Sequence, residues 1–340
     1  MHASELSTPA LVVDLDALDH NIDTMSAARP GPRTRPHVKA FKSTALARHV
    51  ADRGGHGSFC CATLKEMEGM VGAGLDDDLL LANETLDSPR LARLAAATRQ
   101  RITVAVDSPE TVDAARRAAD LARCEISVLI DVNVGLPRCG CAPDDAAGLA
   151  DAARRAGLEV RGVMGYEGHV VGEPERAARV RGLARSLEHL RVAHEAVGGG
   201  LVSAGGTGTF DLHDWADEVQ AGSYLLMDTH YARLELPFRQ AVFVDATVIS
   251  ANTRGAAVAD AGLKSFGMDH GEPSIIGQSM FFSSDEHATF FVDPDHPVGV
   301  GDRVRMIPAH VDPTIAYHER MWVLRGDDVL DEWPVDLRNW

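Results

Sequence analysis

The strongest constraint on the fold is a repeated alternation of short β-prone runs with longer amphipathic helical stretches between residues 10 and 240. The β-prone runs are residues 10–15, 35–40, 57–61, 78–82, 102–106, 126–132, 159–164 and 200–203. The helical stretches are residues 18–27, 43–52, 63–70, 87–97, 108–122, 144–156 and part of 173–197. About seven or eight β/α units of this length predict a parallel (β/α)8 TIM-like barrel. A doubly wound sheet is the alternative, because periodicity alone does not separate the two.

The pattern changes after about residue 238. Short β-prone runs follow one another, parted by Gly, Asp and Pro, and no helical pattern is evident between them. They are residues 241–250, 256–261, 288–292, 303–307 and 321–324. We therefore predict a barrel domain over residues 1–237 and an all-β domain over 238–340, with a boundary near Pro237. The first residues of the chain are candidates for pairing with the β-domain.

Charge and cysteine usage restrict the partners and the compartment. The formal net charge of −17 speaks against nucleic acid or an anionic membrane surface as a partner, because both require a basic face. The five cysteines are odd in number and follow no zinc-finger spacing, and the start of the chain is not signal-like. No apolar run approaches the roughly 20 residues of a membrane helix. We expect a soluble cytoplasmic protein that acts on a small molecule.

Lysine is scarce, and one lysine stands where an active-site amine is expected. The chain has four lysines, and Lys39 ends the β-prone run Arg35-Pro36-His37-Val38-Lys39. The carboxyl ends of barrel strands form the rim on which such barrels build active sites. Burial there lowers the pKa of an amine, as a Schiff-base lysine requires. A solvated lysine at a strand end is the alternative.

Three further segments follow predicted strands and could meet Lys39 at the rim. The glycine-rich run from Ser203 through Gly205, Gly206 and Thr207 could hold a phosphate with its backbone amides, or form a plain tight turn. Arg138 could bond an anionic oxygen or a ring nitrogen, and Tyr166 could stack on an aromatic ring. Their alternatives are a surface arginine and a packing tyrosine.

A histidine and a carboxylate stand two residues apart near the end of the chain. His310 and Asp312 follow the predicted strand 303–307, and on a strand this spacing would project both side chains to one side. Imidazole and carboxylate bind Mn²⁺, Mg²⁺, Zn²⁺ or Co²⁺. Two protein ligands would leave an open and therefore catalytic site. Most such pairs are ordinary loop residues.

Together these segments resemble a known family in the expected order along nearly the whole chain. The quoted motifs are Thr8-Pro9-Ala10, Arg35-Pro36-His37-Val38-Lys39, Lys42-Ser43, Cys61-Ala62-Thr63, Arg138-Cys139-Gly140, Gly205-Gly206-Thr207-Gly208-Thr209, Gly222-Ser223-Tyr224 and His310-Val311-Asp312-Pro313-Thr314. They resemble the D-threonine aldolase and D-serine dehydratase branch of the alanine racemase-like fold. The resemblance implies a pyridoxal-phosphate barrel followed by a β-domain that carries a metal pair.

Residue roles follow from this resemblance. It makes Lys39 the cofactor's Schiff-base lysine and His310 and Asp312 the metal ligands, with Lys39 and His310 as catalytic residues. Arg138 and Tyr166 would contact the pyridine ring or its phenolic oxygen. The residues that would hold the phosphate are Ser203, Gly205, Gly206, Thr207, Gly222, Ser223 and Tyr224.

The resemblance implies a metal-dependent lyase that cleaves D-β-hydroxy-α-amino acids, such as D-threonine, to glycine and an aldehyde. An oxygen ligand at Asp312 favours Mn²⁺ over Zn²⁺ and the aldolase branch over the dehydratase branch. A dehydratase of D-serine or D-3-hydroxyaspartate is the alternative, and an amino-acid racemase or a non-catalytic cofactor carrier fits less well. By family analogy we expect a homodimer.

Overall fold

The computed structural model describes residues 1–252 and 255–340. Its contacts divide the chain into two compact units. The barrel unit contains residues 25–39, 47–222 and 337–340, and the β unit contains residues 1–24, 40–46 and 223–336. The contacts therefore change unit between Gly222 and Ser223, while the domain boundary near Pro237 stays a prediction. Among the described residues, no helix combines the length and the apolar character that crossing a membrane requires.

The barrel unit is built on a parallel sheet in which the strands follow one another in chain order, from β2 to β8. They are β2 Ser58–Cys61, β3 Asp78–Leu81, β4 Arg101–Val106, β5 Ser127–Asp131, β6 Glu159–Gly165, β7 Leu201–Ala204 and β8 Glu218–Val219. Residues 34–37 join the two edges, because Thr34 pairs with Val219 and His37 pairs with Cys60. The predicted (β/α)8 class is confirmed, with an irregular segment in the place of one strand.

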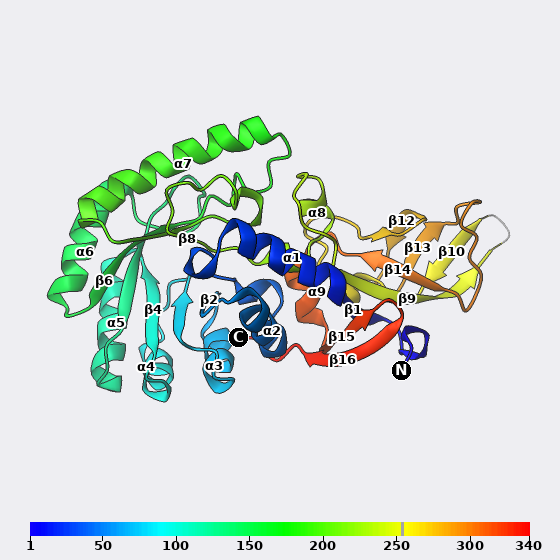
Figure 1. The fold of residues 1–340 in the computed structure, drawn as a ribbon, viewed down its shortest axis with the longest axis horizontal. Helices are drawn as coiled ribbons and strands as arrows, with labels where there is room; N and C mark the ends of the chain where they lie inside the picture. The colour runs from blue at the N-terminus through cyan, green and yellow to red at the C-terminus, as the bar shows by residue number, and fades with distance from the viewer. Residues whose placement is uncertain (253–254) are drawn as a thin grey trace. The chain divides into compact units, whose positions relative to one another are not determined.

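Helices cover the outer side of this sheet (Figure 1). They are α3 Leu64–Gly72, α4 Ser88–Ala97, α5 Pro109–Ala122, α6 Ala146–Arg155 and α7 Arg176–Val197. Thr63 and Glu66 stand in the sequence at the spacing of a capping box, and the structure forms it: Thr63 Oγ1 accepts from the N–H of Glu66, and the Glu66 carboxylate accepts from the N–H of Thr63. The start of this helix could therefore be read from local sequence.

The interior of the barrel is layered, because alternate residues of a strand point to the same face. Ser127, Leu129 and Asp131 of β5 illustrate the three layers. Ser127 donates to Glu159 at the amino ends of the strands. Leu129 lies in the middle in a buried cluster with Cys60, Leu80, Ala105 and Met164. Asp131 ends the strand at the carboxyl rim, so each strand contributes to a polar end, an apolar middle and a polar rim.

The β unit is a nine-stranded sheet in the order β12-β13-β10-β9-β1-β15-β16, with β14 pairing to both β9 and β11. The strands are β1 Ala10–Asp14, β9 Val242–Ala251, β10 Ala256–Ala259, β11 Ser274–Ile275, β12 Ser279–Ser283, β13 Ala288–Phe291, β14 Arg303–Ile307, β15 Arg320–Arg325 and β16 Asp328–Pro334. β1 pairs antiparallel with β9 and parallel with β15. Apolar side chains of these strands form its core, including Val12, Phe243 and Leu324.

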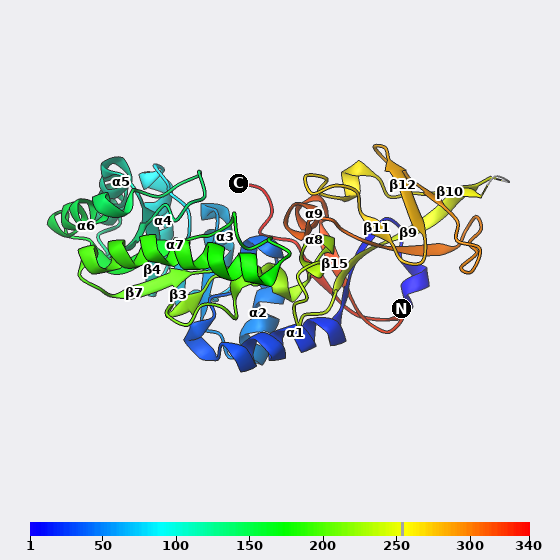
Figure 2. The same cartoon turned by 90° about the horizontal axis from the view of Figure 1, so that it is seen from above.

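The remaining helices include two that the sequence predicted, α1 (Leu15–Ala28) and α2 (Thr44–Gly54), and two that it missed, α8 (Thr229–Ala232) and α9 (Val311–Tyr317). α1 and α2 each pass from one unit to the other, and α8 is a single turn. The prediction that no helix follows residue 238 is wrong, because α9 lies between β14 and β15 (Figure 2). This helix is too short to show helical periodicity, and Pro313 in its first turn reads as a loop residue in sequence.

Candidate active site

Lys39 lies in the first turn after the segment that closes the barrel. The prediction of one strand over residues 35–40 is wrong: Thr34 and His37 form isolated bridges to the edges of the sheet, and Val38–Ala40 form a 3₁₀ turn. Pro36 explains the irregularity, since it has no N–H for a strand ladder. Its carbonyl still accepts from the N–H of Cys60 at 2.9 Å. Lys39 is half-buried.

Arg138, Tyr166 and Gly206 come from three different loops after β5, β6 and β7, and the structure brings them together. The guanidinium carbon of Arg138 lies 5.4 Å from the centroid of the Tyr166 ring, a cation–π distance. A Cβ on Gly206 would lie 3.3 Å from a carbon of that ring. The tyrosine ring therefore lies between the arginine and the glycine-rich run, and the cofactor contacts of these three residues stay predictions.

The glycine-rich run is a tight cradle that only glycine permits at two positions. Gly205 has a φ of +84°, and a Cβ there would lie 2.9 Å from the His213 ring. A Cβ on Gly208 would collide with the carbonyl oxygen of Val171. The run continues into the short 3₁₀ turn Thr207–Thr209. Backbone amides in such a turn suit an anionic group.

A buried hydrogen-bond network, which the sequence analysis did not predict, holds the glycine-rich run in place. The Glu167 carboxylate accepts from Thr209 Oγ1 at 2.6 Å and lies 2.8 Å from His213 Nε2. Burial opposes the charge of Glu167, but the bonds from His213 and Thr209 outweigh it and lower the pKa of Glu167. Arg29 donates to the His213 carbonyl oxygen. The only sequence signal was the position of Glu167 beside Tyr166.

Acidic residues at the rim form a second missed feature. Asp131 is buried at the end of β5 and shares a hydrogen bond with Glu84, which follows β3. Burial, followed by the charge of Glu84, raises the pKa of Asp131 well above its usual value, and the Arg138 guanidinium opposes this shift. Asp107, after β4, accepts from the N–H of Gly140 at 3.2 Å. Asp131 therefore retains a proton more readily than a free carboxyl does.

Two residues predicted to hold a phosphate are engaged elsewhere. Ser203 Oγ donates to Glu218 at 2.6 Å and accepts from Gln220 at 2.8 Å, so its single proton is already used. Ser223 Oγ donates to Asp312 Oδ2 at 3.3 Å within the β unit. Tyr224 is fully buried, which raises the pKa of its phenol. Gly222 ends the barrel unit, one residue before Ser223.

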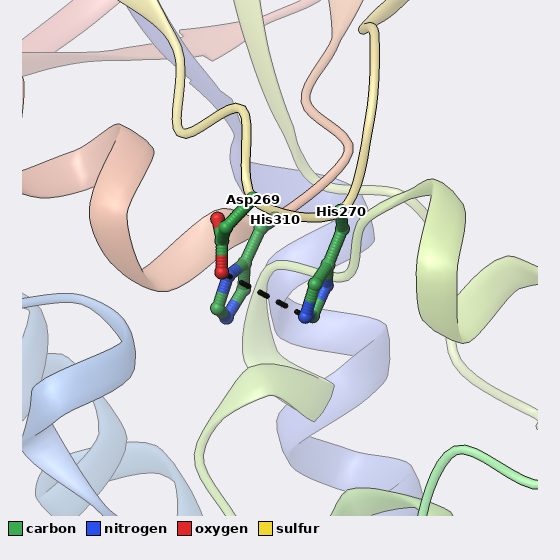
Figure 3. A group of neighbouring side chains, drawn as sticks. All are labelled: Asp269, His270 and His310. Carbon is green, nitrogen blue, oxygen red and sulfur yellow. Dashed lines mark hydrogen bonds and ion pairs between the residues drawn. The ribbon is translucent and has the colours of Figure 1, made fainter.

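His310 and Asp312 lie at the start of α9, not on a strand as their spacing suggested. His310 is the N-cap of this helix and Asp312 is in its first turn. His310 Nε2 and Asp312 Oδ2 are 3.8 Å apart. Two atoms that bind one ion at about 2.1 Å each can be up to about 4.2 Å apart, so the pair can share a divalent ion. Figure 3 shows His310 together with Asp269 and His270, which the sequence analysis did not identify.

Asp228 forms a hydrogen bond with the backbone at the start of α9. Its buried carboxylate accepts from the N–H of Val311 at 2.9 Å and from the N–H of Tyr231 at 2.9 Å. Burial raises the pKa of Asp228 to about 6 despite these bonds. The carboxylate thus fixes the backbone between the two candidate ligands.

Comparison with known families agrees with this arrangement along the chain. Residues 13–230 match the family model "Alanine racemase, N-terminal domain", and residues 241–324 match the "Putative serine dehydratase domain". The chain is 33% identical over 358 residues to a D-threonine aldolase of Arthrobacter sp, covering 99% of this chain and 94% of that protein. This chain belongs to the D-threonine aldolase and D-serine dehydratase-like family.

Other similar proteins are named for different activities. A 3-hydroxy-D-aspartate aldolase of Paracoccus denitrificans is 32% identical over 365 residues, covering 100% of this chain and 94% of that protein. A D-threo-3-hydroxyaspartate dehydratase of Delftia sp. is 31% identical over 294 residues, covering 78% of this chain and 74% of that protein. The solved structure of a D-threonine aldolase from Filomicrobium marinum has a TM-score of 0.92 at 33% identity, covering 98% of this chain and 96% of that chain. The family thus includes both lyase reactions on one fold.

Proposed function

We propose that this family member is a pyridoxal-phosphate- and divalent-metal-dependent lyase that cleaves D-β-hydroxy-α-amino acids, with D-threonine giving glycine and acetaldehyde. The observation that carries the proposal is the combination of a rim amine at Lys39 with a metal pair at His310 and Asp312 on the fold of a D-threonine aldolase. A cofactor carrier needs no metal pair, and a racemase needs none either. The proposal therefore favours lyase chemistry over both.

The barrel unit offers a chemically suitable set of groups for pyridoxal phosphate. Lys39 supplies the amine, and the cradle at Gly205 and Gly206 supplies amides with no side chains in the way. Arg138 and Tyr166 provide a cation and an aromatic face beside that cradle. Because Ser203 is bonded to Glu218, we assign the phosphate contacts chiefly to the backbone amides and to Thr207.

The protein's own groups divide the work. The cofactor would supply an electron sink for the pair released when Cα–Cβ breaks. The Lys39 amine would bind the cofactor and afterwards hold or return a proton. His310 and Asp312 would hold an ion that polarises the β-hydroxyl and eases loss of its proton. The buried Glu167–His213 pair would keep the phosphate cradle rigid.

The metal we favour is Mn²⁺, because the ligands are one imidazole and one carboxylate oxygen. Mg²⁺, Co²⁺ and Zn²⁺ bind the same types of ligand and are the alternatives. A dehydratase acting on D-serine or D-3-hydroxyaspartate is the second candidate function, and the Delftia relative favours it. In that reaction the Cα proton and the β-hydroxyl leave, and keto acid and ammonia are released.

The decisive experiment is product analysis. Protein loaded with pyridoxal phosphate and Mn²⁺ is given D-threonine, D-serine and D-3-hydroxyaspartate in separate assays. We expect glycine and aldehyde from D-threonine, and loss of activity in a chelator. Faster release of keto acid and ammonia from D-serine would overturn the aldolase assignment in favour of the dehydratase. Borohydride should fix the cofactor to the peptide of Lys39, and labelling at Lys42 would show that the wrong lysine was assigned.

We also propose a cytoplasmic homodimer, on family analogy and on a cysteine usage typical of reduced compartments. Light scattering of the purified holoenzyme gives the mass in solution. A mass of one chain, 36.4 kDa, would contradict the dimer.

A further inference from the structure

A segment of the β unit, residues 265–270, runs along α9 and reaches the candidate metal ligand His310. It begins at Ser265, the last residue of the 3₁₀ turn Leu263–Ser265, and ends in a turn at Asp269 and His270, before β11. Three contacts join it to the helix at regular intervals. His318 Nε2 donates to the Ser265 carbonyl at 3.0 Å, the Gly267 N–H donates to Thr314 Oγ1 at 2.9 Å, and Asp269 Oδ2 lies 2.7 Å from His310 Nδ1.

The spacing of these contacts is a geometric match. Residues 265, 267 and 269 meet residues 318, 314 and 310 in antiparallel order. A step of two residues in the segment thus corresponds to four residues, about one turn, of the helix. A Cβ on Gly267 would collide with the Pro313 ring, so the close approach requires glycine at this position. The segment packs closely against the helix and places Asp269 beside His310.

The two ring nitrogens of His310 face different carboxylates. Nδ1 is 2.7 Å from Asp269 Oδ2, the distance of a charge-assisted hydrogen bond. Nε2 is 3.8 Å from Asp312 Oδ2, too long for a hydrogen bond and wide enough for an ion between them. If Nδ1 and Asp269 shared an ion at about 2.1 Å each, the angle at the ion would be only about 80°. These distances therefore suit Asp269 as the carboxylate that positions His310 and Asp312 as the carboxylate that binds the ion.

His270 restrains the same ring from its face. The ring centroids of His270 and His310 are 4.0 Å apart and the ring planes differ by 9° (Figure 3). A flat stack of this kind opposes rotation of the imidazole about its Cβ–Cγ bond. A hydrogen bond at one nitrogen and a stacked neighbour together fix both the plane and the tautomer of His310.

We infer that Asp269 and His270 position His310 for metal binding: Asp269 holds the proton on Nδ1, so that Nε2 presents its lone pair to the ion beside Asp312. This inference rests on the proposed metal pair. A carboxylate that accepts from the far nitrogen of a metal-bound histidine orients the ring and makes it a stronger ligand. Neither residue would touch the ion.

The test is the affinity of the pyridoxal-phosphate-loaded protein for Mn²⁺, measured from the electron paramagnetic resonance signal of free Mn²⁺. Asp269→Ala should weaken binding about 10- to 100-fold. Asp269→Asn should weaken it less, because the amide oxygen still accepts from Nδ1. His270→Ala should weaken it about two- to tenfold. Asp327→Asn is the matched control for charge, since Asp327 is exposed and lies 4.0 Å from His2, and it should bind Mn²⁺ like the wild type.

His310→Ala and Asp312→Ala separate the possible failures. If both abolish binding while Asp269→Ala and His270→Ala bind Mn²⁺ like the wild type, the positioning role is overturned and the metal pair stands. If Asp312→Ala binds normally while Asp269→Ala, His270→Ala and His310→Ala all lose the ion, both proposals fail. Asp269, His270 and His310 would then be the ligands.

The absorption spectrum of bound Co²⁺ gives a second readout that a purely structural role would not change. With Asp269 outside the coordination sphere, Asp269→Asn should keep the visible bands of the wild type once the site is saturated. A changed band intensity would make Asp269 a ligand and overturn the inference. Should Asp269→Ala fail to fold, Asp269→Asn and His270→Ala still decide the question.

Discussion

Both ends of the barrel in the barrel unit contain buried acidic residues, but the partners of these acids differ between the two ends. At the amino ends of the strands, Arg35 bonds Glu218 at 2.7 Å and Asp78 at 3.0 Å, and Arg161 bonds Asp78 at 2.9 Å. At the carboxyl ends, Asp131 shares a hydrogen bond with Glu84, a second acid. The amino end thus pairs Glu218 and Asp78 with arginines, whereas the carboxyl end brings two acids together.

The difference shows up in the pKa of the acids. Burial raises the pKa of Asp78, but the Arg35 and Arg161 charges and hydrogen bonds outweigh it and lower the pKa below its usual value. Burial and Glu84 both raise the pKa of Asp131. The acid Asp78 at the amino end therefore has cations as partners. Asp131 at the carboxyl end has a raised pKa, and perturbed pKa values of this kind are frequent in functional sites. We expect mutations at the first end to change stability and mutations at the second to change chemistry.

Lys39→Ala should give the largest effect and tests the functional end. Removing the amine should lower turnover of D-threonine by about 10⁴-fold or more, since a covalent catalytic group has no substitute. The free energy of unfolding should stay near that of the wild type, because the side chain is only half-buried. Steady-state kinetics and urea titration measure the two effects. Lys65→Ala, on the outer helix α3, is the matched control and should retain activity.

Arg35→Ala should give the next largest effect and tests the other end. It leaves the Glu218 carboxylate without its buried cation and removes one of the two arginines bonded to Asp78, which should cost about 3–5 kcal/mol of unfolding free energy. Arg35→Lys keeps the charge and should cost less. Arg116→Ala removes a partly exposed arginine on the surface of α5 and should change stability by about 0.5 kcal/mol or less. A protein as stable as the wild type after Arg35→Ala would contradict the division between the two ends.

Glu167→Gln should moderately weaken the binding of pyridoxal phosphate. The amide still reaches Thr209 Oγ1 but loses the charge that pairs with His213, so the cradle at Gly205 should loosen. We expect about tenfold weaker binding of pyridoxal phosphate, equivalent to about 1.4 kcal/mol. Equilibrium titration of the apoprotein with the cofactor, followed by visible absorbance, measures it. Unchanged affinity together with lowered stability would assign Glu167 to folding alone.

The smallest expected effect is a difference in pH dependence between the two ends. Asp78, with a lowered pKa, contributes stability above its unfolded value near 3.9, and this is lost as the pH falls through the lowered pKa. Asp131, with a raised pKa, contributes stability below about 3.9 that is lost as the pH rises through the raised pKa. Asp131→Asn should therefore reduce the loss of stability on the alkaline side by on the order of 1 kcal/mol. Urea titrations across the pH range decide it, and an unaltered alkaline profile would contradict the shift.

Much of the fold could be predicted because its signals are local. The alternation of apolar runs and helical stretches located six of the seven parallel strands of the barrel and their helices, and Thr63 with Glu66 marked the start of α3. The strand β8 was missed because it has only two residues, Glu218 and Val219. The helix α9 was missed because it is short and holds a proline. In each case the missing information lies in contacts with distant residues.

The sequence by itself determined the β/α alternation, the change of pattern near residue 238 and the chemistry available at Lys39, Arg138, Tyr166, His310 and Asp312, because residue type and periodicity are local properties. Only the tertiary structure decided which groups share a proton or a partner. Ser203 turned toward Glu218, Glu167 toward His213, and Asp269 reached His310 across 41 residues. Such pairings depend on strand register and on the path of loops, and neither is encoded in the spacing of the residues concerned.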